Sequence, residues 1–70
     1  MEIDVLKTFG ERVRELRIEK KLTQQELADL TGFHKNYIGM LERGERNIAL
    51  KNIESIAKAF EITISQLINF

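Results

Sequence analysis

Two short helix signals on either side of one glycine constrain the fold of this chain more than any other feature. Thr23 and Glu26 have the spacing of a capping box, in which the hydroxyl and the carboxylate each accept a hydrogen bond from a free backbone N–H. Gly32 can adopt the positive φ that ends a helix and turns the chain. The spacing therefore predicts a short helix at about residues 24–31.

A second amphipathic run begins directly after this turn. Ile38 and Leu41 fall on one helical face, and Gly44 supplies another glycine stop, so we expect a helix at about residues 35–43. Two short helices joined by a tight turn form a helix-turn-helix unit, here at about residues 23–44. The second helix of such a unit has an apolar back and a polar front that a DNA groove could accept.

The rest of the chain also reads as helical. Apolar spacing predicts helices at about residues 5–20 and 50–60, and Thr63 and Gln66 form a second capping box before a short helix at about residues 64–69. The predicted apolar stripe of the helix at 50–60 consists of Leu50, Ile53, Ile56, Ala57 and Phe60. With no alternating β-branched run, we expect an all-α fold, with five helices around one core in a single domain, residues 1–70.

Composition excludes several classes of protein. The chain has no cysteine and one histidine, so neither a disulfide nor a structural zinc site is indicated, and we predict no cofactor, metal or small-molecule ligand. No window is apolar enough for a membrane span, and the acidic start lacks the basic residues of a signal peptide, so we expect a cytoplasmic protein. An enzyme is disfavoured, because no nucleophile–base pair or phosphate-binding glycine loop is present.

Charge balance alone argues mildly against a nucleic-acid binder. Eleven basic residues offset eleven acidic residues, so the net charge is zero, whereas affinity for random DNA comes from neutralising phosphates. The distribution is more informative, because residues 35–51 carry a net charge of +2, or +3 if Glu42 is tied to a buried partner. We expect a modestly basic face and an acidic back.

Several motifs together resemble the Cro/C1-type (XRE) family of helix-turn-helix regulators. They are Leu-Thr-Gln-Gln-Glu-Leu-Ala at 22–28, Leu-Glu-Arg-Gly at 41–44 and Asn-Ile-Ala-Leu at 47–50. Within that family the chain looks most like controller proteins of restriction–modification systems. The resemblance implies a lambda-repressor-like domain that binds an inverted-repeat operator in double-stranded DNA as a homodimer. Ala49, where the family usually has a serine cap, and Gly39, inside the recognition helix, depart from its pattern.

The predicted DNA contacts fall into two groups. Residues at the front and N-terminal turn of a recognition helix reach base edges, which here predicts base contacts by Lys35, Asn36, Tyr37 and Met40. Polar residues at the start of the preceding helix and around the following loop would hold phosphates without reading sequence: Gln24, Arg43, Arg46, Asn47, Lys51 and Asn52. The alternative for all of them is an ordinary solvated surface, and for Tyr37 also a phosphate contact through its hydroxyl.

Two further residues resemble a buried ion pair of the family. Arg17 and Glu42 would join the first helix to the recognition helix, and the pair would orient the helices more than stabilise them. The alternative is that Arg17 also reaches a phosphate. His34 is expected to be a helix cap or a surface residue.

The C-terminal residues, about 60–70, carry more apolar side chains than a small monomer can bury. We expect Phe60, Ile64 and Leu67 in the core. The remaining apolar surface predicts a dimer interface, formed by Ile62, Ile64, Ile68 and Phe70.

Other functions remain possible at this point: a phage or mobile-element repressor, or an antitoxin-type module that mainly binds another protein. The antitoxin hypothesis predicts a toxin-binding tail, whereas we expect no such tail after the last helix. The sequence leaves open the operator, the sign of regulation, any effector and any higher-order assembly on DNA.

Overall fold

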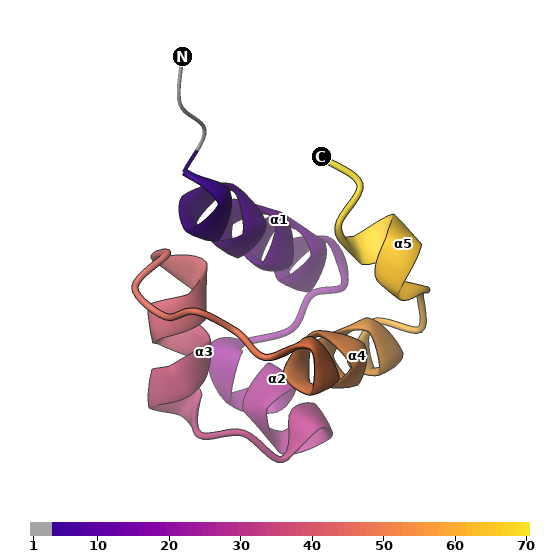
Figure 1. The fold of residues 1–70 in the computed structure, drawn as a ribbon. Helices are drawn as coiled ribbons and strands as arrows, with labels where there is room; N and C mark the ends of the chain where they lie inside the picture. Colours follow the sequence, from indigo (N-terminus) through magenta and orange to yellow (C-terminus); the bar gives the residue numbers. More distant parts are fainter. Residues whose placement is uncertain (1–3) are drawn as a thin grey trace.

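Five helices form the secondary structure of residues 4–70, the part of the chain that the computed structural model describes (Figure 1). They are α1 (Val5–Glu19), α2 (Gln24–Thr31), α3 (Lys35–Glu42), α4 (Leu50–Ala59) and α5 (Ile64–Leu67), and no strand occurs within that range. The all-α prediction is confirmed. Most of the acidic start falls on residues 1–3, outside the described residues.

Four helices end slightly earlier than predicted. Lys20, Arg43 and Phe60 are the C-caps of α1, α3 and α4 instead of their last helical residues, and α5 ends two residues early because Ile68 is its C-cap. Helix ends are the least certain part of a pattern-based prediction, because the last carbonyls can pair in several ways.

Both predicted capping boxes are present. Thr23 Oγ1 accepts a hydrogen bond from Glu26 N at 3.0 Å, and Thr23 N donates to Glu26 Oε1 at 2.8 Å; Thr63 and Gln66 repeat the arrangement. Gly32 adopts a φ of +78° and ends α2. The N-cap of α1 was not predicted: it is Asp4, which accepts from Leu6 N and Lys7 N. The N-caps of α3 and α4, His34 and Ala49, make no side-chain cap bond.

All five helices contribute to one core, in which α3 packs against α1 and α2, and α4 packs against α2 and α5. Its fully buried side chains include one or more from every helix: Val13, Leu27, Ile38, Leu41, Ile56 and Leu67, with Phe60 just after α4. The prediction that Leu50 belongs to the buried stripe of α4 is wrong, because this side chain is 71% exposed. Leu50 is the first residue of α4, and this end of the helix extends beyond the core. Ile48, in the preceding loop, packs against the core instead.

Two contacts of α1 fix its neighbours. Gly10 faces the end of α3 so closely that an added Cβ would lie 2.6 Å from the backbone oxygen of Glu42. Arg12 donates to the backbone oxygens of Gln66 and Leu67, at 2.9 and 3.3 Å, and thereby satisfies carbonyls at the end of α5. The inner side of α3 is therefore held against α1 by backbone contact as well as by side chains.

The apolar C-terminus divides differently from the prediction. Leu67 and Phe60 are buried, as expected, but Ile64 is only half-buried against the core. Ile62, expected to be surplus surface, is also half-buried and packs against the core, because it occupies the staple position before the α5 capping box. Ile68 and Phe70 remain 45% and 55% exposed.

Candidate DNA interface

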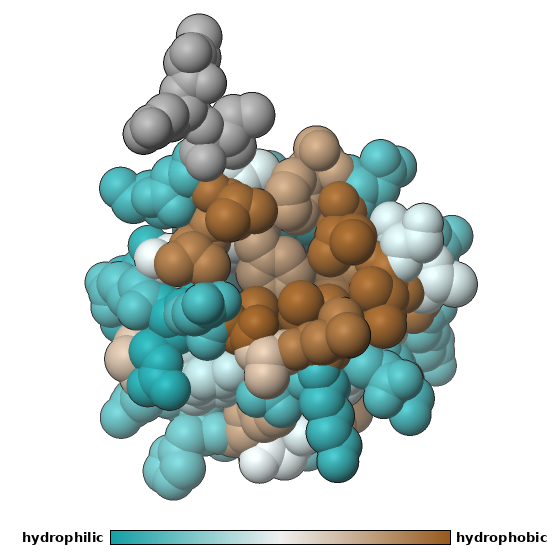
Figure 2. Space-filling model, in the orientation of Figure 1, coloured by the Kyte–Doolittle hydropathy of each residue, from teal (hydrophilic) through white to brown (hydrophobic). Residues whose placement is uncertain are grey.

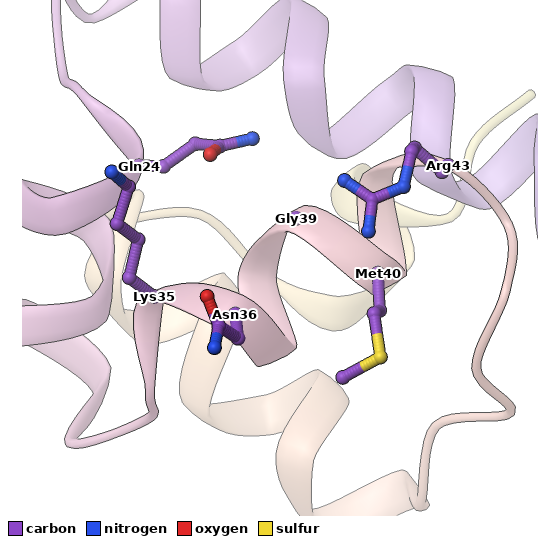
Figure 3. A pocket seen from close by; sticks show the side chains of 6 residues that line it. All are labelled: Gln24, Lys35, Asn36, Gly39, Met40 and Arg43. Carbon is purple, nitrogen blue, oxygen red and sulfur yellow. The ribbon is translucent and has the colours of Figure 1, made fainter.

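The outer side of α3 presents a polar surface with an open pocket of about 310 Å³ (Figure 3). The residues that line it are Gln24, Lys35, Asn36, Gly39, Met40 and Arg43. Side chains four apart on a helix are neighbours, so Lys35, Gly39 and Arg43 form one row along the helix and Asn36 and Met40 form the next. The structure brings three of the four predicted base-contact residues together on this surface.

Tyr37, the fourth, sits differently. Its half-buried ring packs edge-on against Phe33, with ring centres 5.1 Å apart, and the Arg46 guanidinium lies 5.4 Å from the ring centre. Asn52 Nδ2 donates to the Tyr37 hydroxyl at 3.2 Å. Tyr37, Arg46 and Asn52 therefore form one cluster that joins α3 to α4, a contact that the sequence pattern did not indicate. Asn47 and Lys51 are exposed beside it.

The inner side of α3 ends at a buried ion pair. Arg17 Nε and Nη2 donate to Glu42 Oε2 and Oε1, at 2.6 and 3.1 Å, and Arg17 Nη1 donates to the backbone oxygen of Leu22 at 2.8 Å. The side chains are only 12% and 3% exposed. The structure thus contains the ion pair that the sequence indicated. All three guanidinium nitrogens of Arg17 bond within the fold, which argues against the alternative of a phosphate contact.

Gln24 links this pair to the outer surface. Its Nε2 donates to Glu42 Oε1 at 3.2 Å, and the residue also lines the outer pocket. The Glu42 carboxylate therefore accepts three hydrogen bonds, which satisfies it inside the fold. A side chain predicted only as a phosphate contact also connects the start of α2 to the end of α3.

A second arginine–carboxylate pair lies on the outer side. Arg43 Nε and Nη2 donate to Glu45 Oε2 and Oε1, at 2.9 and 3.2 Å, and the two side chains are 58% and 53% exposed. The hydrogen bond and the adjacent charge lower the pKa of Glu45 and raise the pKa of Arg43. This pair was not predicted, because it depends on the path of the loop after α3.

The burial of Glu42 determines the net charge of the surface formed by residues 35–51. With Glu42 neutralised by Arg17, the exposed charges of residues 35–51 are the cations Lys35, Arg43, Arg46 and Lys51 and the single carboxylate of Glu45. The condition set out for a net charge of +3 is met. Such a surface attracts phosphates even on a neutral protein.

Other kinds of site find little support in the described part of the chain. His34 is exposed and its side chain makes no cap bond. Between residues 4 and 70, no three His, Asp or Glu side chains are placed to hold a metal ion, and no helix has the length and apolarity to cross a membrane.

Known proteins share this fold. A helix-turn-helix family model (HTH_3) matches residues 13–67. The chain is 41% identical over 63 residues to the control protein C.BamHI of Bacillus amyloliquefaciens, covering 89% of this chain and 78% of that protein. The crystal structure of the restriction–modification controller protein C.AhdI from Aeromonas hydrophila superimposes with a TM-score of 0.86 at 47% identity, covering 89% and 90% of the two chains.

A second similar structure includes DNA. The restriction–modification controller protein C.Esp1396I, solved as a tetramer in complex with its natural 35 base-pair operator, matches with a TM-score of 0.81 at 28% identity. The match covers 96% of this chain and 97% of that one. From the family match and these relatives together, the chain belongs to the Cro/C1-type (HTH_3) helix-turn-helix family.

Proposed function

We propose that this protein is a homodimeric, sequence-specific DNA-binding transcription regulator that controls a restriction–modification system. The observation that carries the proposal is the two-sided recognition helix. Its inner side is fixed by Gly10 and by the Arg17–Glu42 pair, while its outer side presents exposed donors and acceptors on a basic face. The kinship with restriction–modification controller proteins supports the regulatory role.

Base reading is assigned to the outer side of α3. Lys35 can donate to guanine O6 and N7, and Asn36 can pair with adenine through two hydrogen bonds. Met40 offers an apolar contact to a thymine methyl group. Tyr37 lies beside them, and its hydroxyl, although it accepts from Asn52, still has a proton to donate.

Phosphate contacts are assigned to residues around this surface. The start of α2 favours an anion through its free N–H groups and its dipole, which supports a phosphate contact by Gln24. The other contacts come from the loop after α3 and the start of α4: Arg46, Asn47, Lys51 and Asn52. These contacts set the register of the protein on DNA.

A second copy of the chain is the occupant we propose for the apolar groove between α1, the α3–α4 loop and the C-terminal residues. Figure 2 shows apolar side chains gathered on this face. The groove is lined by Val5, Leu6, Phe9, Asn47, Ile48, Ile53, Ile68 and Phe70. Two predicted interface residues, Ile68 and Phe70, belong to it, whereas Ile64 borders a separate depression with Leu50 and Ile62 packs inward.

A dimer also accounts for affinity. One short helix reads only a few base pairs, whereas two recognition helices about 34 Å apart read two half-sites one DNA turn apart. The operator would be an inverted repeat with half-sites about ten base pairs apart, centre to centre. A DNA mobility-shift assay on the region upstream of the gene for this protein tests the proposal. A specific shift with cooperative dependence on protein concentration is expected, and no preference over unrelated DNA would overturn it.

The dimer contact has its own test. Ile68→Asp places a charge in the groove and should give a folded monomer with much weaker operator binding. Leu30→Asp adds the same charge to another exposed apolar position, on α2, and should leave the dimer intact. In sedimentation equilibrium, a wild-type monomer at micromolar concentration or an unaffected Ile68→Asp dimer would defeat this placement.

We place this regulator in the cytoplasm, where DNA is accessible to it, and we assign it no enzymatic role. The outer side of α3 offers hydrogen-bond donors and acceptors rather than a nucleophile activated by a base.

A further inference from the structure

Arg43 follows the last residue of α3, yet its side chain lies back over the middle of that helix. Its Nη1 is 3.1 Å from the point that a Cβ on Gly39 would occupy, and both residues line the outer pocket (Figure 3). Long side chains at helical positions lean toward the N-terminus of the helix. The missing side chain at Gly39 leaves the room that the guanidinium occupies.

Glu45 holds one edge of this guanidinium and leaves another free. Its carboxylate binds Nε and Nη2 of Arg43. A guanidinium has five N–H donors in one plane, so the edge formed by Nη1 and the second hydrogen of Nη2 remains available. Within residues 4–70, Nη1 makes no hydrogen bond. The free edge lies against Gly39, on the row of α3 that begins at Lys35.

We propose that Arg43 reads a guanine in the major groove and that Glu45 is the positioning residue that orients it. This inference rests on the proposed function, since it assumes an operator. The two parallel donors of the free edge match guanine O6 and N7. Adenine presents N7 beside an N6 amino group at the same place, so one donor of Arg43 would face another donor. The geometry therefore selects guanine over adenine.

The carboxylate itself argues against the simpler role of Arg43 as a phosphate contact. A negative charge beside the DNA backbone weakens attraction to phosphates and cancels part of the arginine charge. An exposed ion pair also contributes little stability. What Glu45 supplies is a fixed orientation of a planar donor group, which matters for a base edge and much less for a phosphate.

The test uses the full chain and an operator duplex that the wild-type protein selects from a random-sequence pool. Affinity for this duplex and for an unrelated duplex is measured for wild type, Arg43→Gln and Glu45→Gln. Guanines in one half-site are replaced singly by 7-deazaguanine, which removes the N7 acceptor. One such replacement should weaken wild-type binding by about tenfold, the scale of a good base contact. The same replacement should change Arg43→Gln binding little.

Glu45→Gln separates positioning from simple charge. A glutamine has one acceptor oxygen, so it cannot form the two parallel hydrogen bonds that the two carboxylate oxygens form with Arg43 Nε and Nη2. Operator affinity should fall about fivefold, while affinity for unrelated DNA stays level or rises because a negative charge is gone. The matched control is Glu54→Gln, which removes one charge from a carboxylate that is also 53% exposed and lies near Lys58 on α4. It should shift both affinities alike.

Two results would overturn the inference while leaving the proposed function in place. Equal losses for Arg43→Gln on operator and unrelated DNA would make Arg43 a phosphate contact. Tighter binding of Glu45→Gln to both duplexes would make Glu45 a merely repulsive charge. A wild-type protein that selects no sequence from the pool would instead overturn the proposed function itself.

Discussion

Two arginine–glutamate pairs meet at the end of the recognition helix, where Glu42 belongs to one pair and the next residue, Arg43, belongs to the other. The two pairs differ in burial, in exposure to solvent and in the elements they join. Glu42 points inward and binds Arg17 with side chains 3% and 12% exposed, whereas Arg43 points outward and binds Glu45 with both side chains more than half exposed. Successive residues on a helix are separated by about 100°, so neighbours in sequence can belong to opposite sides of the protein.

The difference shows that the same pair of groups serves different ends according to burial. The inner pair has left water, so its charges must stay paired, and it ties α1 to α3. The outer pair is screened by solvent and contributes little stability, but it restrains a side chain that faces the candidate DNA surface. The inner pair fixes the position of α3 against α1. The outer pair restrains the Arg43 side chain at the candidate DNA surface.

The largest effect is expected when the inner pair is broken. Arg17→Ala or Glu42→Ala would leave one buried charge without its partner, which should cost about 3–5 kcal/mol of unfolding free energy. Thermal melts followed by circular dichroism measure this loss. Melting near the wild-type temperature for both variants would remove the contrast between the pairs.

A double variant sharpens the same test. Arg17→Met combined with Glu42→Met removes both charges while keeping the space filled, so its loss should be smaller than the sum of the losses of the single variants Arg17→Met and Glu42→Met. A loss equal to that sum would mean that the two side chains do not interact.

The next effect concerns two glycines: Gly10 on α1, which contacts the inner side of α3, and Gly39, which lies on the outer side of α3. Gly10→Ala would push a Cβ into the backbone at the end of α3, and such overpacking should cost about 1–3 kcal/mol. Gly39→Ala meets only the ends of the flexible Arg43 and Gln24 side chains, so the higher helix propensity of alanine should stabilise the fold by up to about 1 kcal/mol. Urea unfolding of both variants decides the matter, and equal effects would contradict the close approach of α1 to α3.

Local signals predicted the framework of this fold because they act over a few residues. Thr23 with Glu26 and Gly32 define α2 through hydrogen bonds and backbone angles that do not depend on the rest of the chain. Leu50 was misassigned because helical spacing cannot say how far a helix extends past the core.

The site was less predictable where it depends on loops. The Arg17–Glu42 pair could be predicted from the family resemblance. The outward-facing residues of α3 could be predicted from their place in the helix-turn-helix motif. The Arg43–Glu45 and Tyr37–Asn52 contacts depend on how the chain runs from Gly44 to Ala49. That segment has no periodic pattern, so its side-chain pairs become visible only in three dimensions.

Variants on the outer side of α3 should lower DNA affinity and leave stability almost unchanged, whereas variants of the inner pair should lower stability. Lys35→Ala and Asn36→Ala should each cost about 1–3 kcal/mol of specific binding, with little change in melting temperature because both side chains are exposed. Fluorescence anisotropy on operator and random duplexes measures the two affinities. Equal losses on both would move Lys35 and Asn36 to the class of phosphate contacts.

The smallest effect is expected for the stability of the outer pair. The pKa of Glu45 lies below its ordinary value of 4.5, because Arg43 donates a hydrogen bond to the carboxylate and carries a nearby positive charge. A carboxyl with a lower pKa in the folded state stabilises the fold at pH above its unfolded pKa. That contribution disappears as the pH falls through the lowered value. Because solvent screens this pair, Glu45→Gln should melt at pH 7 close to the Glu54→Gln control, and its small difference from wild type should vanish in acid.

The carboxyl itself reports the pair more directly than melting does. In an NMR titration, the wild-type Glu45 carboxyl should titrate below pH 4.5, and Arg43→Gln should return its pKa to the ordinary range. The result bears on function as well, because a screened pair can be weak in free energy and still orient a guanidinium. An unchanged pKa in Arg43→Gln would show that the pair does not persist in solution, and the fixed donor edge proposed for reading guanine would then lose its support.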